Sequence, residues 1–473
     1  MATAPAGLEP PTLTGWPVVG ALWELRRNYL GTMVRADREV GGLARIVAGP
    51  PGWRLTIISV TSPALIEEVL SNPQRFRKDH PGYRELRQAL GVNLLTSEDD
   101  SWHRQRRLLA SVFTRRRVTT LYAPVMAEEA QRLVERWRPT AERGDPLDTY
   151  PEMITMASRV SGRILFGADM SAVADLLVRF RRVNDQLLRR ATSPHPLPTY
   201  VPTPGNRRLQ RGLRRTRAIV DELISRRRPR TDSVTAAEPV DRSTSGAQTV
   251  DMLGLLLAAR DAENGADRLS ATEVADQAML FLLAGHDTTS VALSCTLILL
   301  ALHPDWQQRL RDEADAVLDG RPPTVDDFLR MPWTERTVRE SLRLFPAAHG
   351  MGRSTRGDQL LGGYQIPADS WVEISIWGTH HSARTWPDPE RFDPARFDLA
   401  EGRHPGGHRC AYLPFGYGAR ACIGMSIALT EVTITVATIL QSYVVTTPFR
   451  DIPVHAAITL MPTGRIPIVV RPR

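Results

Sequence analysis

Lysine and cysteine are nearly missing from this chain of 473 residues. Lys78 is the only lysine, so 59 of the 60 basic side chains are arginines. This skew is typical of a GC-rich genome, because most arginine codons are rich in G and C. The three cysteines are too few to cross-link such a chain, which excludes a secreted protein held together by disulfides.

Signals for export and for nucleic-acid binding are also missing. Met1–Pro5 has neither the basic start nor the apolar run of a signal peptide, so we expect a protein of the reducing cytoplasm. The net charge of +8 is compatible with nucleic-acid binding, yet the arginines are scattered, with no basic tail and no interleaved aromatics. We therefore expect no nucleic-acid partner and interpret the arginines as a solvated surface or a contact for an acidic protein.

The sequence predicts a mainly helical fold with a small β region. Apolar residues make up 42% and charged residues 24%, an ordinary globular balance. Apolar positions recur at helical spacing in Ala127–Trp137, Met153–Leu165, Ala172–Leu188, Leu209–Ile224 and Trp306–Leu318. Strands are predicted at Leu43–Val47 and Leu55–Val60, then at Leu360–Ile366, with Gly362-Gly363 as a hairpin turn, and at Trp371–Ile376. We expect the rest of the chain to be helical.

Three segments are predicted to lie outside regular elements. Residues 1–15 are expected to be loose until Trp16 and Leu22 reach a core. Five prolines make Ser193–Gly205 a loop, and the composition of residues 226–249 is typical of an exposed linker. We nevertheless expect one domain over residues 1–473, because the chemistry described below draws on both sides of that linker.

A single long helix is predicted between a capping box and a proline. Ser270 is the N-cap with Glu273 three residues later, and Pro304 ends the helix. The span of about 32 residues is about 48 Å long, enough to cross a globule. Its apolar ends suggest a membrane span, but the polar notch Gly285–Ser290 would put an ionisable aspartate at the bilayer centre. We therefore expect a buried helix and no membrane span.

The notch has two interpretations. It can be a structural polar patch whose groups bond within the core. Alternatively, Gly285 leaves room for a flat group against the helix, with the Asp287 carboxylate and the Thr288 hydroxyl beside that space. We favour the second interpretation, because glycine and consecutive threonines destabilise a buried helix without a purpose.

Cys422 lies between a glycine-rich loop and the predicted helix Gly424–Gln441. A thiolate at a helix N-terminus is stabilised by the helix dipole and by backbone N–H groups, so it can serve as an anionic ligand. Phe415 can shield the sulfur, Arg420 can pair with a carboxylate, and the glycines of the loop let a planar cofactor approach the backbone. The loop is thus a candidate cofactor site.

Other cysteines and histidines are interpreted as structural. Cys295 and Cys410 are expected to be small core residues. His380-His381 has no spaced acid or cysteine to complete a metal site, and His286 is expected to face away from a cofactor.

Together these features resemble the cytochrome P-450 family of haem-thiolate monooxygenases. The family's haem-binding pattern is matched at Phe415, Gly418, Arg420, Cys422 and Gly424. Its oxygen-activating stretch is matched by Ala284–Thr289. Further family patterns are matched by Trp102 with Arg106, Glu340 with Arg343, and Arg396 in the segment Phe392–Phe397, while Arg353 lies where a second propionate-binding arginine is common.

The resemblance implies a fold and residue roles. It implies a single-domain cytochrome P-450 fold in which Cys422 is the axial ligand of haem b, while Asp287 and Thr288 control proton delivery. The other haem contacts would come from Phe415, Gly418, Arg420, Gly424, Trp102, Arg106, Arg353, Ala284 and Gly285. A buried structural triad would consist of Glu340, Arg343 and Arg396.

The implied reaction inserts one oxygen atom of O2 into an apolar organic substrate and reduces the other to water. We expect a terpenoid or polyketide of bacterial specialised metabolism. A fatty-acid hydroxylase of the same family is the alternative, and a non-catalytic haem protein, such as a gas sensor or carrier, is the alternative from another class.

The sequence also suggests where substrate and electron donor make contact. Substrate contacts are expected from Pro81–Leu95, Phe180–Gly205 and Ala347–Met351. The chain shows no flavin or iron–sulfur module, so electrons are expected from a ferredoxin with its reductase. Arginines near the thiolate face would attract an acidic ferredoxin, namely Arg104, Arg107 and Arg115–Arg117.

Overall fold

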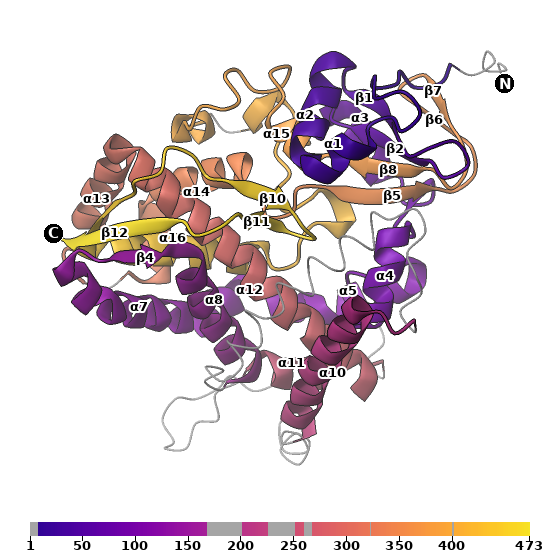
Figure 1. Ribbon diagram of the computed structural model, residues 1–473. Coiled ribbons are helices and arrows are strands. Elements are labelled where there is room, and N and C mark those ends of the chain that lie inside the picture. Colours follow the sequence, from indigo (N-terminus) through magenta and orange to yellow (C-terminus); the bar gives the residue numbers. More distant parts are fainter. Residues whose placement is uncertain (1–7, 168–200, 226–250, 260–266, 322, 400–401) are drawn as a thin grey trace.

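The computed structural model describes residues 8–167, 201–225, 251–259, 267–321, 323–399 and 402–473 (Figure 1). It confirms a mainly helical fold with small sheets. The α-helices are α1 (Leu22–Arg27), α2 (Tyr29–Glu39), α3 (Pro63–Ser71), α4 (Pro81–Leu90), α5 (Asp99–Ala110), α6 (Arg115–Arg117), α7 (Ala123–Arg143), α8 (Thr149–Phe166), α10 (Pro204–Ser225), α11 (Met252–Ala258), α12 (Ala271–Leu302), α13 (Pro304–Leu318), α14 (Pro332–Leu344), α15 (Ile376–His380) and α16 (Met425–Ser442).

The strands form four small sheets among the described residues. The largest has the order β1 (Leu43–Ala48), β2 (Leu55–Val60), β8 (Trp371–Ile374), β5 (Met351–Thr355) and β3 (Phe76–Arg77). A second has the order β4 (Pro146–Asp148), β12 (Pro467–Pro472) and β9 (Tyr443–Thr446). Two hairpins pair β6 (Gln359–Leu361) with β7 (Tyr364–Ile366), and β10 (Val454–Ala456) with β11 (Leu460–Pro462).

Helix α12 runs through the middle of the molecule, with α8, α14 and α16 packed against it (Figure 1). Its predicted capping box is present, since Ser270 and Glu273 exchange side-chain and backbone hydrogen bonds. By length and composition α12 and α16 could each cross a membrane. The apolar stretch of α12 is 78% buried by the protein itself, which fits the core helix that the sequence predicted.

The helices on both sides of residues 226–249 pack together, because α8 and α12 are in contact. The linker itself and the predicted helix Ala172–Leu188 lie outside the described residues. The predicted loop Ser193–Gly205 is described only from residue 201, and there it ends early, because α10 begins at Pro204. Proline suits this position, since the first turn of a helix needs no N–H donors.

The prediction of a loose N-terminus was wrong for its described part. Leu13 is buried, and its N–H donates to the Arg45 carbonyl at 2.9 Å, so residues 11–13 run along the edge of β1. Trp16, which was expected to enter the core, is 63% exposed. Backbone pairing to a sheet edge, rather than side-chain burial, therefore holds this segment.

The prediction that the rest of the chain is helical was also wrong in the C-terminal region. Residues 443–472 contain β9, β10, β11 and β12, and β5 follows the α14 region. These strands have three to six residues each, too few for alternation of apolar and polar side chains to stand out. One pairing partner is also distant in sequence, since β12 pairs with β4 about 320 residues earlier, with Pro467 opposite Asp148.

Candidate active site

The cysteine loop is a tight turn that leads into α16. Gly416 and Gly418 have φ values of 71° and 74°, in the left-handed region that favours glycine. The Cys422 N–H donates to the Phe415 carbonyl at 2.8 Å, which closes the loop. Gly424 is the N-cap of α16, so Cys422 lies just before the helix, as the sequence predicted.

The Cys422 side chain is exposed. Desolvation by the surrounding loop raises the pKa of its thiol, and the Gly424 N–H and the Arg106 guanidinium oppose this shift. The role of Cys422 as an anionic ligand stays a prediction. A bound metal ion would supply the missing positive charge, because a coordinating thiol loses its proton.

A cluster of buried cations lies beside this loop. Lys78 and Arg353 are 7% and 5% exposed. Lys78 Nζ donates to the Leu95 carbonyl at 2.7 Å, and Arg353 Nη1 donates to the Gly352 carbonyl at 2.8 Å. Arg420 Nη1 donates to the Ser97 carbonyl at 3.0 Å, and its guanidinium lies 4.5 Å from the centre of the Trp102 ring. These three acceptors are neutral backbone carbonyls.

The charges of this cluster repel one another. Burial is the main cause that lowers the pKa of Lys78 well below its usual value, and the charges of Arg353 and Arg420 add to this effect. Burial is also the main cause that lowers the pKa of Arg420 to about 10, and the charge of Arg353 adds to it. Glu98 is the nearby acid that opposes both shifts. Buried cations without matching anions are costly, so this site fits a group with carboxylates of its own, such as the propionates of haem.

Lys78 was missed as a site residue by sequence reasoning. A signal was available, because a chain that uses arginine almost everywhere keeps one lysine here. Lysine offers a compact charge on a flexible stem, which fits a crowded site better than a planar guanidinium. Its Nζ also lies 4.3 Å from the centre of the Tyr83 ring, and Tyr83 bonds Arg353. Tyr83 was missed as well.

The notch of α12 presents two residues away from the packed core. Ala284 is exposed and Thr288, one turn later, is partly exposed, although most of the helix around them is buried. Gly285 differs from its prediction, since a Cβ there would lie 3.1 Å from Ser161 Oγ of α8. Gly285 therefore gives room to α8, and Ala284 and Thr288 form the open side of the helix.

Asp287 is held by two hydroxyl groups from distant elements. Tyr150 of α8 donates to Asp287 Oδ1 at 3.1 Å, and Thr459, beside β11, donates to Asp287 Oδ2 at 2.6 Å. Neither partner was identified from the sequence. Thr288 Oγ1 donates to the Ala284 carbonyl at 2.7 Å, the local bond expected for a structural threonine. His286 is buried and bonds the Leu282 carbonyl.

Glu340, Arg343 and Arg396 lie together, as expected. Arg343 makes two hydrogen bonds to the Glu340 carboxylate, at 2.8 and 2.9 Å, and both side chains are fully buried. The Asp393 N–H donates to Glu340 at 3.0 Å, and Arg396 Nε lies 3.4 Å from the same carboxylate. Burial raises the pKa of Glu340, and Arg343 opposes this shift.

His380 connects this triad to the cysteine loop, a link that sequence reasoning missed. Its Nδ1 lies 2.9 Å from the Arg343 carbonyl, and its Nε2 accepts the Leu413 N–H at 2.9 Å. Burial lowers its pKa, so the ring is neutral, with one donor and one acceptor as both bonds require. Leu413 precedes Phe415 by two residues, so α14 and the cysteine loop share this ring.

A cleft of about 540 Å³ lies between α4, α10 and α12. Leu90, Leu213 and Met279 give it apolar walls, and Arg214 and Arg217 give it a basic side. Met279, the residue of α12 in its wall, lies about 9 Å along the helix from Gly285. Leu90 and Gly91, within the segment Pro81–Leu95 predicted for substrate contacts, also line the cleft, while 180–200 lies outside the described residues.

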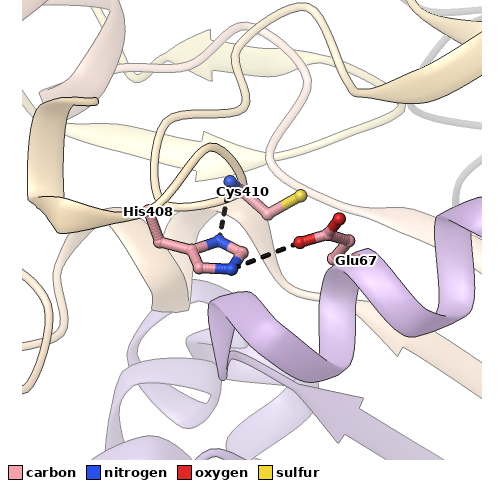
Figure 2. Close-up of side chains that lie close together, drawn as sticks. All are labelled: Glu67, His408 and Cys410. Carbon is pink, nitrogen blue, oxygen red and sulfur yellow. Dashed lines mark hydrogen bonds and ion pairs between the residues drawn. The ribbon is translucent and has the colours of Figure 1, made fainter. Parts of the chain in front are cut away.

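Glu67, His408 and Cys410 lie close together, with their possible metal-binding atoms within 4.8 Å of one another (Figure 2). The Cys410 N–H donates to His408 Nδ1 at 3.0 Å, so the ring hydrogen is on Nε2, which faces Glu67 at 3.3 Å. A metal would need the lone pair of that Nε2, and Arg409 already pairs with Glu67. These contacts describe an ion-pair cluster. Cys295 and Cys410 are buried, as predicted.

Comparisons with known proteins agree with this geometry. Residues 10–466 match the family model described as cytochrome P450. The cyclooctat-9-en-7-ol 5-monooxygenase of Streptomyces melanosporofaciens is 34% identical over 89% of this chain and 86% of its own length. The pentalenene oxygenase of Streptomyces avermitilis is 33% identical over 91% and 90%. The crystal structure of the cytochrome P450DA heme domain is 28% identical, with a TM-score of 0.85 over 99% of both chains.

Proposed function

The chain belongs to the cytochrome P450 family and is a monooxygenase, and on this premise we propose that its substrate is an apolar terpenoid of bacterial specialised metabolism. The observation that carries the proposal is its likeness, over about nine-tenths of the chain, to P450s that modify terpenoids.

A fatty-acid hydroxylase is the second candidate, and the basic side of the cleft favours it. A fatty acid needs a cation for its carboxylate. Arg217 already pairs with Asp276 and Asp221, which leaves Arg214 as the residue that would meet such a group. Binding titrations that follow the spin state of the haem separate the candidates. We expect polycyclic terpenes to shift it and long-chain fatty acids to leave it unchanged.

We propose that Cys422 would bind the iron of haem b and that Lys78, Arg353 and Arg420 would pair with its propionates, together with Trp102 and Arg106. Haem bound in this way supplies the activation of O2. The chain supplies the thiolate, the cations and a site closed by α12. Asp287 and Thr288 supply groups that hold protons, which a protein that only carries haem or senses a gas does not need.

The proposed proton route begins at Asp287. The Tyr150 and Thr459 hydroxyls fix both oxygens of its carboxylate, so its position is set before the reaction starts. Thr288 Oγ1, one residue later, keeps two acceptor lone pairs while it donates to Ala284. It can therefore accept a hydrogen bond from a water and order that water on the open side of the helix.

Replacing Thr288 by alanine should divert reductant into hydrogen peroxide while haem binding and the CO spectrum stay unchanged. General acid–base catalysis raises a reaction rate by about 10²–10⁴-fold, so the amount of product formed per reductant should fall strongly in Thr288→Ala. Asp287→Asn should slow turnover, with a larger solvent isotope effect. Ser294→Ala, which removes the same kind of bond from α12, is the control. An unchanged ratio of product to reductant in Thr288→Ala would exclude the proton role.

We propose an acidic ferredoxin with its reductase as the electron donor. One predicted contact needs correction, because Arg104 pairs with Asp267 at 2.8 Å and Glu273 at 2.6 Å. Arg115 and Arg116 of α6 are exposed and make no ion pair with a described carboxylate, so they are the better candidates.

Charge reversal at Arg115 and Arg116 should slow reduction by ferredoxin several-fold. Opposite charges speed association and are screened by salt, so the wild-type rate should also fall as ionic strength rises. Stopped-flow reduction measures both effects, with Arg471→Glu as an exposed control. If the rate of reduction changes neither with salt nor with either substitution, these arginines only solvate the surface.

A further inference from the structure

The exposed tryptophans of this protein are gathered in one place. The sequence has ten tryptophans, all within the described residues. Trp16, Trp23 and Trp53 are 63%, 50% and 64% exposed, and the other seven are buried or half-buried. All three belong to the first 53 residues, which hold the exposed Val18 as well, at 66%. Large exposed aromatics in one place usually mark a contact surface.

Backbone hydrogen bonds bring these side chains to one corner. The turn from Trp16 to Gly20 lies beside the end of β1, because Gly20 pairs with Ala48 and the Gly49 N–H donates to the Val19 carbonyl at 2.9 Å. The β1–β2 turn that follows Gly49 carries Trp53, and α1 begins two residues after Gly20. We call Trp16, Val18, Trp23 and Trp53 the tryptophan corner. The elements that carry it lie at the end of the molecule where the N-terminus is marked (Figure 1).

The backbone of this corner is strained in a way that exposes an apolar side chain. Val18 has a φ of 70°, and a β-branched residue there is an outlier. Such strain persists only where the surroundings impose it, and it often marks a functional position. Here the bonded turn from Trp16 to Gly20 imposes it, and Val18 gains no burial in return. Stability of the fold alone does not explain this turn.

Positive charge surrounds the corner. Arg26 and Arg27, at the end of α1, and Arg54, next to Trp53, are exposed and make no ion pair with a described carboxylate. The nearby acids are already engaged, since Glu24 pairs with Arg35 and Glu9 pairs with Arg45. The corner therefore offers apolar tips within a cationic rim.

We propose that the tryptophan corner docks on an anionic phospholipid surface and holds the enzyme there without crossing the membrane. Tryptophan prefers the boundary between headgroups and acyl chains, and exposed arginines are attracted by anionic lipid. The corner consists of two turns and the first turn of α1, and its separate exposed side chains can enter a soft headgroup layer without a matching protein surface. Docking would place the enzyme beside the phase in which an apolar substrate dissolves, but the docking itself does not depend on the identity of that substrate.

The test uses the full-length, haem-loaded protein and vesicles of phosphatidylcholine with or without phosphatidylglycerol. We expect co-sedimentation with the anionic vesicles, weakening as salt rises. Trp16→Ser/Trp23→Ser/Trp53→Ser should weaken binding about tenfold or more, and Arg26→Glu/Arg27→Glu/Arg54→Glu about 100-fold. Brominated lipids should quench part of the wild-type tryptophan fluorescence and none of the fluorescence of the triple serine variant.

Two controls keep the result specific. Leu399→Ser removes an exposed apolar residue elsewhere, and Arg138→Glu reverses an exposed charge on α7, toward the end of the molecule marked C (Figure 1). Both should bind vesicles as the wild type does, and all variants should keep haem and the CO spectrum. Wild-type protein that stays in the supernatant, or tryptophan variants that bind equally well, would overturn the proposal. A dimer dissociated by the serine variant, without vesicle binding, would show a protein interface instead.

Discussion

Cys422→Ala should abolish the red-shifted Soret band of the reduced, CO-bound protein, whereas Cys410→Ala should leave it intact. The band requires a thiolate on the iron. Cys422 lies at the end of a loop whose glycines expose its backbone, beside buried cations that fit propionates. Cys410 is fully buried in the core beside the largest sheet, and burial raises the pKa of its thiol to about 11.

The two cysteine variants are matched, because each removes one sulfur from neighbouring segments of the same chain. Difference spectra of the reduced protein with and without CO measure the effect, and haem content measured separately shows whether the pocket survives. Loss of the band in Cys410→Ala with retention in Cys422→Ala would refute the assignment of the loop.

Arg343→Ala should destabilise the fold by about 3–5 kcal/mol, because it leaves the buried Glu340 carboxylate without its main partner. It also removes the donor to the His380 carbonyl at 2.8 Å. Arg339→Ala is the matched control on the same helix, since Arg339 pairs with the partly exposed Glu335 at 2.7 Å. Such helical surface pairs contribute about 0.3–0.5 kcal/mol. Urea unfolding of the haem-loaded protein measures both.

The loss in Arg343→Ala should shrink as pH falls. Without Arg343, the pKa of Glu340 rises further above its ordinary value, and the protonated carboxyl no longer needs a cation. The variant then recovers stability relative to wild type as pH drops through that raised pKa. If Arg343→Ala and Arg339→Ala lower the free energy of unfolding equally at all pH values, the buried Glu340–Arg343 pair stabilises the fold no more than a surface pair does.

The sequence was sufficient where chemistry depends on local spacing. The glycines around Cys422, the capping box at Ser270 and the Glu340–Arg343 pair each lie within one loop or one turn of helix, so the residue order alone defined them. The strands Leu43–Ala48 and Leu55–Val60 were likewise predicted to within a residue, because branched residues and a glycine-rich turn mark them.

The sequence was not sufficient where chemistry depends on contacts between distant segments. Tyr150 and Thr459 meet Asp287 from 137 and 172 residues away, and no local pattern announces such a contact. His380 joins α14 to the cysteine loop through hydrogen bonds between its ring and two backbone groups. No pattern in the residues around His380 indicates which backbone groups its ring contacts.

Isotopically labelled O2 tests most directly whether this chain is a monooxygenase that oxidises a terpenoid. Reduced protein is supplied with labelled O2 and with cyclooctat-9-en-7-ol or pentalenene, the compounds after which its relatives are named. We expect product that carries one labelled oxygen atom, with the other atom in water and two electrons consumed per product. Oxygen consumption without labelled product from any terpene that shifts the haem spin state, or product whose oxygen comes from water, would contradict this expectation.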